Sequence, residues 1–457
     1  MKKQATIFLI FLLISIPVFS INWNYEKDTL TISGEGKIKD FQWQQERPWE
    51  KYKDSTTTII ISEGITNIGD YAFADFSKVE NIYIPSTVET IGNSSFVLCN
   101  KLSNINGTKT DFFIFNNKLI KYTGKESSVT IPYTVTTIGE YAFLGSKTLK
   151  EITIPETVKT IEKGIFSGCE NLTTINGKET DFFIFNNTLI NYINRENTTA
   201  TIPENVKIIG EDAFALCQNL QEVIIPEGVT TIKKLAFEDC KNLKNIKLPE
   251  TLTTIETGAF ARCSSLENIE LPDSVTEIGD WAFSDCISLK NITISKSITS
   301  ISEGTFDGCT SLENITIPEN IKEIGNYAFT KCASLESIIL PENITNLGFS
   351  IFSYCTKLKK VELSKNLTNI PDITFSGCRS LETIIIPDNI KNIGNYAFLN
   401  CTSLKNISLP DGITTINTCT FSGCSNLETI KIPETVTEIN KYAFSGCSSL
   451  RSEEDER

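Results

Sequence analysis

The chain has 457 residues, of which 40% are hydrophobic and 21% are charged, a composition that can form a buried core. Its 56 acidic and 42 basic residues give a net charge of −14. Nucleic acids and anionic membranes both attract positive surfaces, so we expect neither as a partner. The absence of histidine from the sequence excludes Ser-His-Asp and Cys-His catalytic machinery.

Residues 1–20, MKKQATIFLIFLLISIPVFS, have the form of a secretory signal peptide. Two lysines precede an apolar run, and Val18 and Ser20 occupy the −3 and −1 positions of a cleavage site before Ile21. An uncleaved membrane anchor is the alternative, but the run is short for the ~18–20 apolar residues of a membrane span. We expect export, and a mature chain with no transmembrane segment.

A repeat with a period of 23 residues dominates the rest of the chain. Phenylalanine recurs at positions 214, 237, 260, 283, 306, 329, 352, 375, 398, 421 and 444, and upstream at 73, 96, 143 and 166. Leucine and proline keep columns of the same spacing, with Ser295 and Ser364 replacing the proline twice. Such a period is typical of a solenoid, in which stacked units bury one another's apolar side chains.

One unit, or rung, is residues 312–335, LENITIPENIKEIGNYAFTKCASL. The inward side chains of a short predicted strand are Leu312, Ile315 and Ile317. Pro318 ends this strand, because it lacks an N–H for a ladder and its φ is fixed. Further inward side chains on the return path are Ile321, Ile324, Ala328 and Phe329. Gly325 is expected to allow the bend between them.

Two solenoids fit this period: a leucine-rich-repeat horseshoe and a parallel β-helix. A β-helix usually has three strand-like segments per coil, whereas one segment alternates clearly here and the Ile-x-x-Gly-x-x-Ala-Phe portion does not. The horseshoe is therefore favoured. We expect a repeat solenoid whose strands form a long parallel β-sheet, with ~4.8 Å between neighbouring strands.

The pattern L-x-x-I-x-I-P-x-x-I-x-x-I-G-x-x-A-F-x-x-C-x-x-L, at about 57–450, resembles the BspA-like class of leucine-rich repeats. The N-terminal segment also resembles the family's N-terminal cap. Three of its stretches occur in the expected order: LTISGEGKIKDF at 30–41, PWEKY at 48–52 and TTIIISEGITNIGDYAF at 57–73. The resemblance implies a horseshoe or superhelix with a β-rich cap at 21–56, which shields the first sheet edge. It also implies adhesion or recognition at a cell surface, with extracellular-matrix or host proteins as ligands.

Two longer gaps in the phenylalanine column hold near copies of one another, at about 105–132 and 175–203. Each copy lacks the Ala-Phe-x-x-Cys element but has alternating, β-prone residues and an Asn-Asn turn signal. We interpret each as a hairpin-like variant rung. A docking site on the paired FFIF segments is the alternative. After the repeats, residues 451–457 form an acidic tail.

Thirteen of the 14 cysteines occupy one column, three residues after the phenylalanine. Disulfide scaffolds normally staple small domains that lack a core, and a metal site would need paired cysteines or histidines. A reactive thiol needs a base or an electropositive setting, which a repeated column does not indicate. We predict that these cysteines are small, buried packing residues. Cys419 lies outside the column and is the best candidate for a thiol that pairs or reacts.

We predict no catalytic residue, no cofactor and no metal. Carboxylate-pair catalysis needs no histidine. However, an active site usually interrupts a repeat, and no rung from 214 to 444 is interrupted. No glycine loop that could cradle a phosphate is present in the sequence. An enzyme acting on polysaccharides is therefore the least favoured alternative.

The outward positions of the sheet are where a solenoid binds partners. Two places after the column leucine, asparagines recur and can form a hydrogen-bonded ladder. At the position one residue after the leucine, acidic and basic residues nearly alternate from rung to rung. These opposite charges on neighbouring rungs should stabilise the stack. Four places after the leucine lies a candidate binding face, with scattered surface hydrophobes as the alternative interpretation. Its residues are Ile224, Lys247, Glu270, Ile339, Glu362, Ile385 and Lys431.

Eleven N-x-S/T sequons occur, and they matter only in a eukaryotic secretory route. The candidate glycosylation sites are Asn93, Asn106, Asn171, Asn186, Asn197, Asn343 and Asn366. Glycans at Asn291, Asn314 or Asn406 would crowd the sheet face proposed for binding.

Together these features predict a secreted or cell-surface, non-enzymatic binding protein. Its expected partners are extracellular or cell-surface proteins or glycans, recognised through the solenoid surface. A structural surface-coat protein without a discrete ligand is the alternative from another class.

Overall fold

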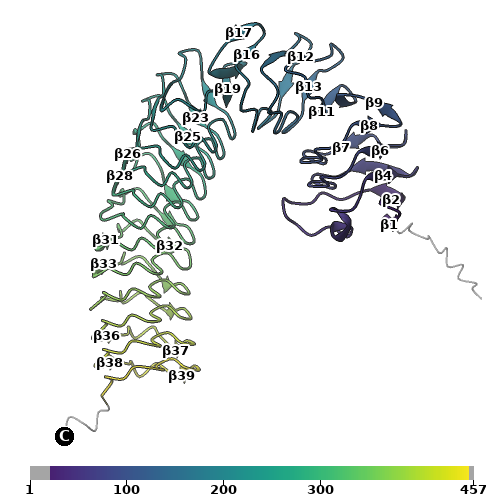
Figure 1. The fold of residues 1–457 in the computed structure, drawn as a ribbon. Helices are drawn as coiled ribbons and strands as arrows, with labels where there is room; N and C mark the ends of the chain where they lie inside the picture. The colour runs from purple at the N-terminus through teal and green to yellow at the C-terminus, as the bar shows by residue number, and fades with distance from the viewer. Residues whose placement is uncertain (1–20, 452–457) are drawn as a thin grey trace, which may run out of the picture. The chain divides into compact units, whose positions relative to one another are not determined.

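The computed structural model describes residues 21–451 and shows a solenoid of short strands joined by turns (Figure 1). The described chain contains one helical segment, a 3-10 turn at Glu50–Tyr52. Within residues 21–451, no helix is long and apolar enough to cross a membrane. The predicted signal peptide and residues 452–457 of the predicted tail lie outside the described residues.

The chain divides into two compact units. The first ends at Ser146 and also includes Pro155–Ile165, and the second comprises Lys147–Ile154 and the described chain from Phe166 onward. The strands of the first unit are β1 (Ile21–Glu26), β2 (Thr29–Gly34), β3 (Gly36–Lys37), β4 (Thr58–Ile61), β5 (Ile65–Ile68), β6 (Asn81–Tyr83), β7 (Thr90–Ile91), β8 (Asn104–Ile105), β9 (Thr108–Lys109), β10 (Phe112–Phe115), β11 (Lys118–Tyr122), β12 (Ser128–Thr130), β13 (Thr137–Ile138) and β15 (Thr160–Ile161).

The first unit begins with an antiparallel hairpin of β1 and β2, and β2 then pairs in parallel with β4 of the first rung. Trp49 is buried between this hairpin and the rung. Its indole Nε1 donates a hydrogen bond to the carbonyl of Ala72 at 2.9 Å, and its ring stacks on Phe73 with 5.6 Å between centroids. Trp49 therefore takes the place of a column phenylalanine and covers the end of the aromatic stack.

Each longer insertion between rungs contains an antiparallel hairpin that joins the stack. In the first unit β10 and β11 pair through a turn at Asn116 and Asn117, both with positive φ (46° and 65°). Asparagine tolerates this left-handed conformation, which two-residue hairpin turns require. β11 then continues in parallel with β13 and β15. Residues 182–192 repeat the hairpin in the second unit.

In the second unit most rungs contribute two parallel strands, one of three residues and one of two. The longer strands are β14 (Glu151–Thr153), β18 (Phe182–Phe185), β19 (Thr188–Tyr192), β20 (Thr199–Thr201), β22 (Glu222–Ile224), β24 (Asn245–Lys247), β26 (Asn268–Glu270), β28 (Asn291–Thr293), β31 (Ser337–Ile339), β33 (Lys360–Glu362), β36 (Asn406–Ser408) and β38 (Thr429–Lys431). The two-residue strands are β16 (Thr174–Ile175), β17 (Lys178–Glu179), β21 (Ile208–Ile209), β23 (Thr231–Ile232), β25 (Thr254–Ile255), β27 (Glu277–Ile278), β29 (Ser300–Ile301), β30 (Glu323–Ile324), β32 (Asn346–Leu347), β34 (Asn369–Ile370), β35 (Asn392–Ile393), β37 (Thr415–Ile416) and β39 (Glu438–Ile439).

The predicted solenoid, with parallel strands at 23-residue intervals, is confirmed. The register advances by one repeat at each step, as in the pairing of Val223 with Ile246. Two details differ from the expectation. The second strand of the rung was not predicted, because two residues are too short to show alternation. The parallel sheet is also divided into several short sheets.

The core of the second unit is a set of side-chain columns that run from rung to rung. Phe237 and Phe260 stack with 5.1 Å between ring centroids and 3° between planes, and offset stacks of this kind continue to Phe444. The inward residues predicted for the rung 312–335 are buried, apart from Ile315, which is half-buried. Gly325 allows the backbones of neighbouring rungs to approach closely, because a Cβ at this position would lie 2.6 Å from the backbone nitrogen of Glu303.

Candidate functional site

The seven residues of the predicted binding face all point outward from the sheet. Six of them end a three-residue strand in which the middle residue is inward, and Ile385 holds the equivalent position in its rung. Ile339 is 59% exposed and Ile385 is 83% exposed, whereas their chain neighbours Ile338 and Ile384 are buried. The alternation of a strand therefore sets which isoleucines reach solvent.

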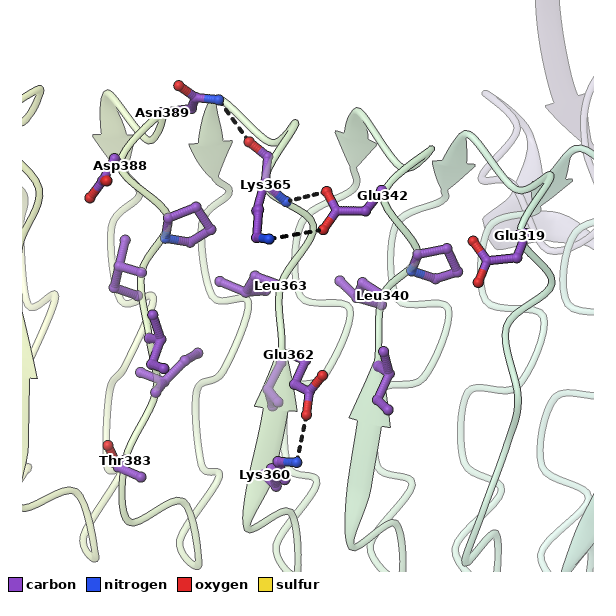
Figure 2. A pocket seen from close by; sticks show the side chains of 17 residues that line it. Glu319, Leu340, Glu342, Lys360, Glu362, Leu363, Lys365, Thr383, Asp388 and Asn389 are labelled. Carbon is purple, nitrogen blue, oxygen red and sulfur yellow. Dashed lines mark hydrogen bonds and ion pairs between the residues drawn. The ribbon is translucent and has the colours of Figure 1, made fainter.

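The structure brings three of the seven together. Ile339, Glu362 and Ile385 lie on successive rungs and line one hollow of about 830 Å³ (Figure 2). The other members lie elsewhere. Lys247 and Glu270 line a separate hollow of about 550 Å³, and Lys431 lines one of about 720 Å³ that Ile385 also borders. Ile224 lines none of these hollows.

The main hollow lies where the strand pairing of the sheet is interrupted. β31 and β33 form a two-stranded sheet by themselves. The following segment, residues 383–385, joins the next rung through a single bridge between Thr383 and Asn406. The floor between these parts is apolar, because Leu340 and Ile386 are buried there and Leu363 is half-buried.

Charged side chains surround this apolar floor, and most of them are paired. Lys360 Nζ lies 2.5 Å from Glu362 Oε1. The backbone N–H of Lys365 donates to Glu342 Oε2 at 3.1 Å, and Lys365 Nζ lies 3.9 Å from the other oxygen (Figure 2). The side-chain amide of Asn389 donates to the carbonyl of Lys365 at 2.8 Å. These contacts neutralise two of the carboxylates at the hollow.

Two further carboxylates, those of Glu319 and Asp388, stand at opposite ends of the hollow. Within residues 21–451, no hydrogen bond or ion pair engages either side chain. Sequence analysis did not single out these two residues. The signal that could have found them is the residue after the column proline, which is acidic in most rungs.

We call this column the acidic row. It comprises Glu156, Glu204, Glu227, Glu250, Asp273, Glu319, Glu342, Asp388, Asp411 and Glu434. Lysine interrupts it at Lys296 and Lys365, the two rungs in which serine replaces the proline. In both cases the backbone N–H of the lysine donates to the acid of the preceding rung, at 3.2 Å for Asp273 and 3.1 Å for Glu342.

The other outward columns have structural roles. The amide of Asn291 donates to Asn268 Oδ1 at 3.1 Å, as predicted for an asparagine ladder. In the alternating charge column, lysines pair with the glutamate of the preceding rung, as Lys290 does with Glu267 at 2.9 Å. This hydrogen bond lowers the pKa of the Glu267 carboxyl and raises that of the Lys290 ammonium.

The column cysteines pack in the core, as predicted. Twelve of them are buried, and Cys447 in the last described rung is partly exposed. Burial raises the pKa of the Cys286 thiol to about 12, so the thiolate needed for reaction or metal binding is disfavoured. Cys419 is a partly exposed free thiol with a φ of 53°. Among residues 21–451, no group of three His, Cys, Asp or Glu side chains could hold a metal ion.

Several candidate glycosylation asparagines use their side-chain amides to tie rungs together. Amide donors to backbone carbonyls of the preceding rung are Asn106 (to Ile84, 3.2 Å), Asn171 (to Lys147, 2.7 Å), Asn343 (to Glu319, 2.5 Å) and Asn366 (to Glu342, 2.7 Å). Asn93 instead bonds the carboxylate of Glu140 at 3.3 Å. Asn186 lies in a hairpin turn, and the amide of Asn197 lies 3.5 Å from Asp181.

Comparison with known families and structures shows that the chain is similar to leucine-rich repeat proteins. The BspA type Leucine rich repeat region matches in six overlapping copies, at residues 51–173, 113–244, 184–311, 230–358, 278–401 and 322–451. A leucine-rich repeat protein from Bacteroides ovatus ATCC 8483 is 30% identical over 94% of this chain and 92% of that chain, with a TM-score of 0.45.

Two other solved structures are similar over most of their length. A leucine-rich repeat protein from Eubacterium ventriosum ATCC 27560 is 25% identical over 83% of this chain and 92% of that chain, with a TM-score of 0.38. A leucine rich cell surface protein from Faecalibacterium prausnitzii A2-165 is 23% identical over 90% of this chain and 93% of that chain, with a TM-score of 0.37. No curated protein matches. The chain belongs to the family of BspA type leucine-rich repeat proteins.

Proposed function

We propose that this protein is a non-enzymatic binding protein of the cell surface or extracellular space. It recognises a macromolecular partner, in adhesion or a related recognition process, through the sheet face around Ile339, Glu362 and Ile385. Export directed by residues 1–20 and a cap at 21–56 are parts of the same proposal. Membership of the BspA type family supports a binding role. The similar F. prausnitzii protein is itself described as a cell surface protein.

The observation that carries the proposal is the exposure of two isoleucines that line the same hollow. Ile339 and Ile385 are 59% and 83% exposed, and both line it. Burying such side chains against a partner yields roughly 25 cal/mol per Å² of apolar surface. Exposed apolar surface rimmed by polar groups is typical of interaction sites. A coat protein without a discrete ligand would have no need of this arrangement.

The experiment is a binding screen with the chain from residue 21 onward, immobilised for biolayer interferometry. The analytes are purified extracellular-matrix proteins, cell-surface proteins and polysaccharides. We expect saturable binding of at least one of them. The variant Ile339→Asp/Ile385→Asp should lose this binding. The matched control Ile224→Asp should keep it, since Ile224 is 49% exposed on an equivalent strand position outside the hollow.

Two outcomes would contradict the proposal. The absence of saturable binding to every analyte would favour the surface-coat alternative. Equal binding by the parent protein and the Ile339→Asp/Ile385→Asp variant would place recognition elsewhere on the solenoid.

A further inference from the structure

We propose that the occupant of the Ile339–Ile385 hollow is an extended polypeptide segment with two cationic side chains about four residues apart and apolar side chains between them. This inference rests on the proposed function, because it assigns the chemistry of the partner that the same hollow binds. Three properties of the hollow support it: its unpaired charges, its apolar lining and the spacing of its rungs.

The charges of the hollow favour a cationic partner. Glu342 and Glu362 are paired with Lys365 and Lys360, respectively. The carboxylates of Glu319 and Asp388 are left without an engaged partner in the described chain, one at each end (Figure 2). The site therefore presents two separated negative charges. A ligand with two positive groups at matching distance would pair with both.

The lining favours a polypeptide over a glycan. None of the 17 residues that line the hollow is aromatic, whereas sugar rings are commonly held by stacking on aromatic side chains. The apolar surface instead comes from branched aliphatic side chains, including Ile339, Leu363 and Ile385. Such a surface suits aliphatic side chains of a partner. Their burial is favourable in proportion to the apolar area removed from water and requires no particular orientation.

The spacing favours an extended chain that runs from rung to rung. Glu319 and Asp388 lie three rungs apart, which corresponds to about 14 Å at the ~4.8 Å separation of neighbouring strands. An extended peptide advances about 3.3 Å per residue, so residues i and i+4 are separated by about 13 Å and point to the same side. Residues i+1 and i+3 point to the other side. Cations at i and i+4 can therefore reach the acidic row while apolar residues between them face the isoleucines.

The middle position, i+2, faces the paired charges of Glu342 and Lys365 and needs no charge of its own. The expected ligand pattern is Lys or Arg, apolar, small, apolar, Lys or Arg. Its pairing with Glu319 and Asp388 is exposed to solvent and should weaken as salt concentration rises.

The test uses a phage-displayed library of random 12-residue peptides, selected on the immobilised chain from residue 21 onward. We expect enrichment of peptides with two cationic residues four positions apart and apolar residues between them. A synthetic copy of the most enriched peptide should bind the variant Glu319→Gln/Asp388→Asn about five- to tenfold more weakly, the combined effect of two exposed ion pairs. The control Glu204→Gln/Glu434→Gln, in the same acidic row outside the hollow, should bind like the parent protein.

The inference is overturned if no peptide is enriched, if the enriched peptides show no cationic pattern, or if the Glu319→Gln/Asp388→Asn variant binds the peptide unchanged. These results are distinguishable from failure of the proposed function. If the protein partner is lost by Ile339→Asp/Ile385→Asp but kept by Glu319→Gln/Asp388→Asn, the hollow binds a partner of other chemistry. If neither variant changes binding of the protein partner, the hollow is not the binding site.

Discussion

The thiol of Cys240 donates a hydrogen bond to the backbone carbonyl of Phe214 in the preceding rung, with 3.1 Å between sulfur and oxygen. The same carbonyl accepts the backbone N–H of Cys217, also at 3.1 Å. The contact recurs down the column, for example from Cys332 to Phe306 at 3.3 Å. Cysteine suits this position because it is small and apolar and carries a weak donor for a buried carbonyl.

The first prediction concerns the reactivity of these thiols. At pH 8 the native protein should react slowly with Ellman's reagent, because burial raises the pKa of Cys99 to about 11 and of Cys286 to about 12. The partly exposed Cys419 should react first. In denaturant all 14 cysteines should react. Absorbance at each stage counts the thiols. Fewer than 14 in denaturant without reductant would reveal disulfides and contradict the packing role.

The second prediction concerns Lys121, which is 5% exposed in β11 of the first unit. Burial lowers the pKa of its ammonium group below the usual 10.5. The unfolded chain then binds more protons than the folded chain between the lowered pKa and 10.5. The free energy of unfolding contributed by this group therefore decreases as pH falls through that window. The corresponding residue of the sister hairpin, 70 positions later, is the buried Asn191.

Lys121→Asn should accordingly raise the unfolding free energy at pH 7 by about 1–3 kcal/mol, with a smaller gain at pH 10. Urea unfolding followed by circular dichroism at several pH values measures this difference. The reciprocal change Asn191→Lys should destabilise the protein, most strongly at low pH. A gain from Lys121→Asn that is the same at pH 7 and pH 10 would show that the lysine is not the titrating group.

The third prediction concerns a column with positive φ, two residues before each phenylalanine. Ile373 has a φ of 62°, a conformation that is unfavourable for a β-branched residue. Ile373→Asn should stabilise the protein by about 0.5 kcal/mol, the strain relief exceeding the loss of a half-buried side chain. Gly304 lies in the same column and has a φ of 57°. A Cβ on Gly304 would lie 2.2 Å from Cε3 of Trp281. Gly304→Ala should therefore destabilise by more than about 1 kcal/mol.

Urea midpoints of the two variants measure these shifts. The expected signs are opposite although both residues belong to one column. Shifts in the same direction would mean that backbone strain does not decide which side chains the column accepts.

The buried part of each rung could be predicted because stacking demands the same side chain at the same place every 23 residues. Ile321, Ile324, Ala328 and Phe329 are each 0% exposed, as the pattern indicates. The positive φ angles were not foreseen, because bulky residues such as Tyr327 occupy those positions and glycine marks them only in some rungs.

The hollow was predicted in part. The outward isoleucines follow from the two-residue alternation of a strand, so Ile339 and Ile385 could be identified from sequence. The unpaired acids could not be identified from sequence. Whether Glu319 or Asp388 is paired depends on whether a lysine lies in the neighbouring rung. Lys365 pairs with Glu342 across one rung, and no such lysine follows Glu319. Pairing between rungs becomes visible only when the columns are placed side by side.

The fourth prediction tests the alternation that creates the binding face, with two adjacent isoleucines. Ile385 is 83% exposed, whereas Ile384 is 4% exposed and belongs to the core. Ile385→Asp should change the unfolding free energy by no more than about 0.5 kcal/mol, as is usual for exposed positions. Ile384→Asp should destabilise by several kcal/mol, because it places an unpaired carboxylate among apolar side chains.

Thermal and urea unfolding of the two variants provide the measurement. Hydrogen exchange should show that Ile384→Asp loosens the rungs on either side of residue 384, while Ile385→Asp leaves their protection unchanged. If Ile385→Asp were the more damaging change, the register of this rung would be shifted by one residue. Ile339→Asp/Ile385→Asp would then unfold the site, so its loss of binding could not identify the partner-binding surface.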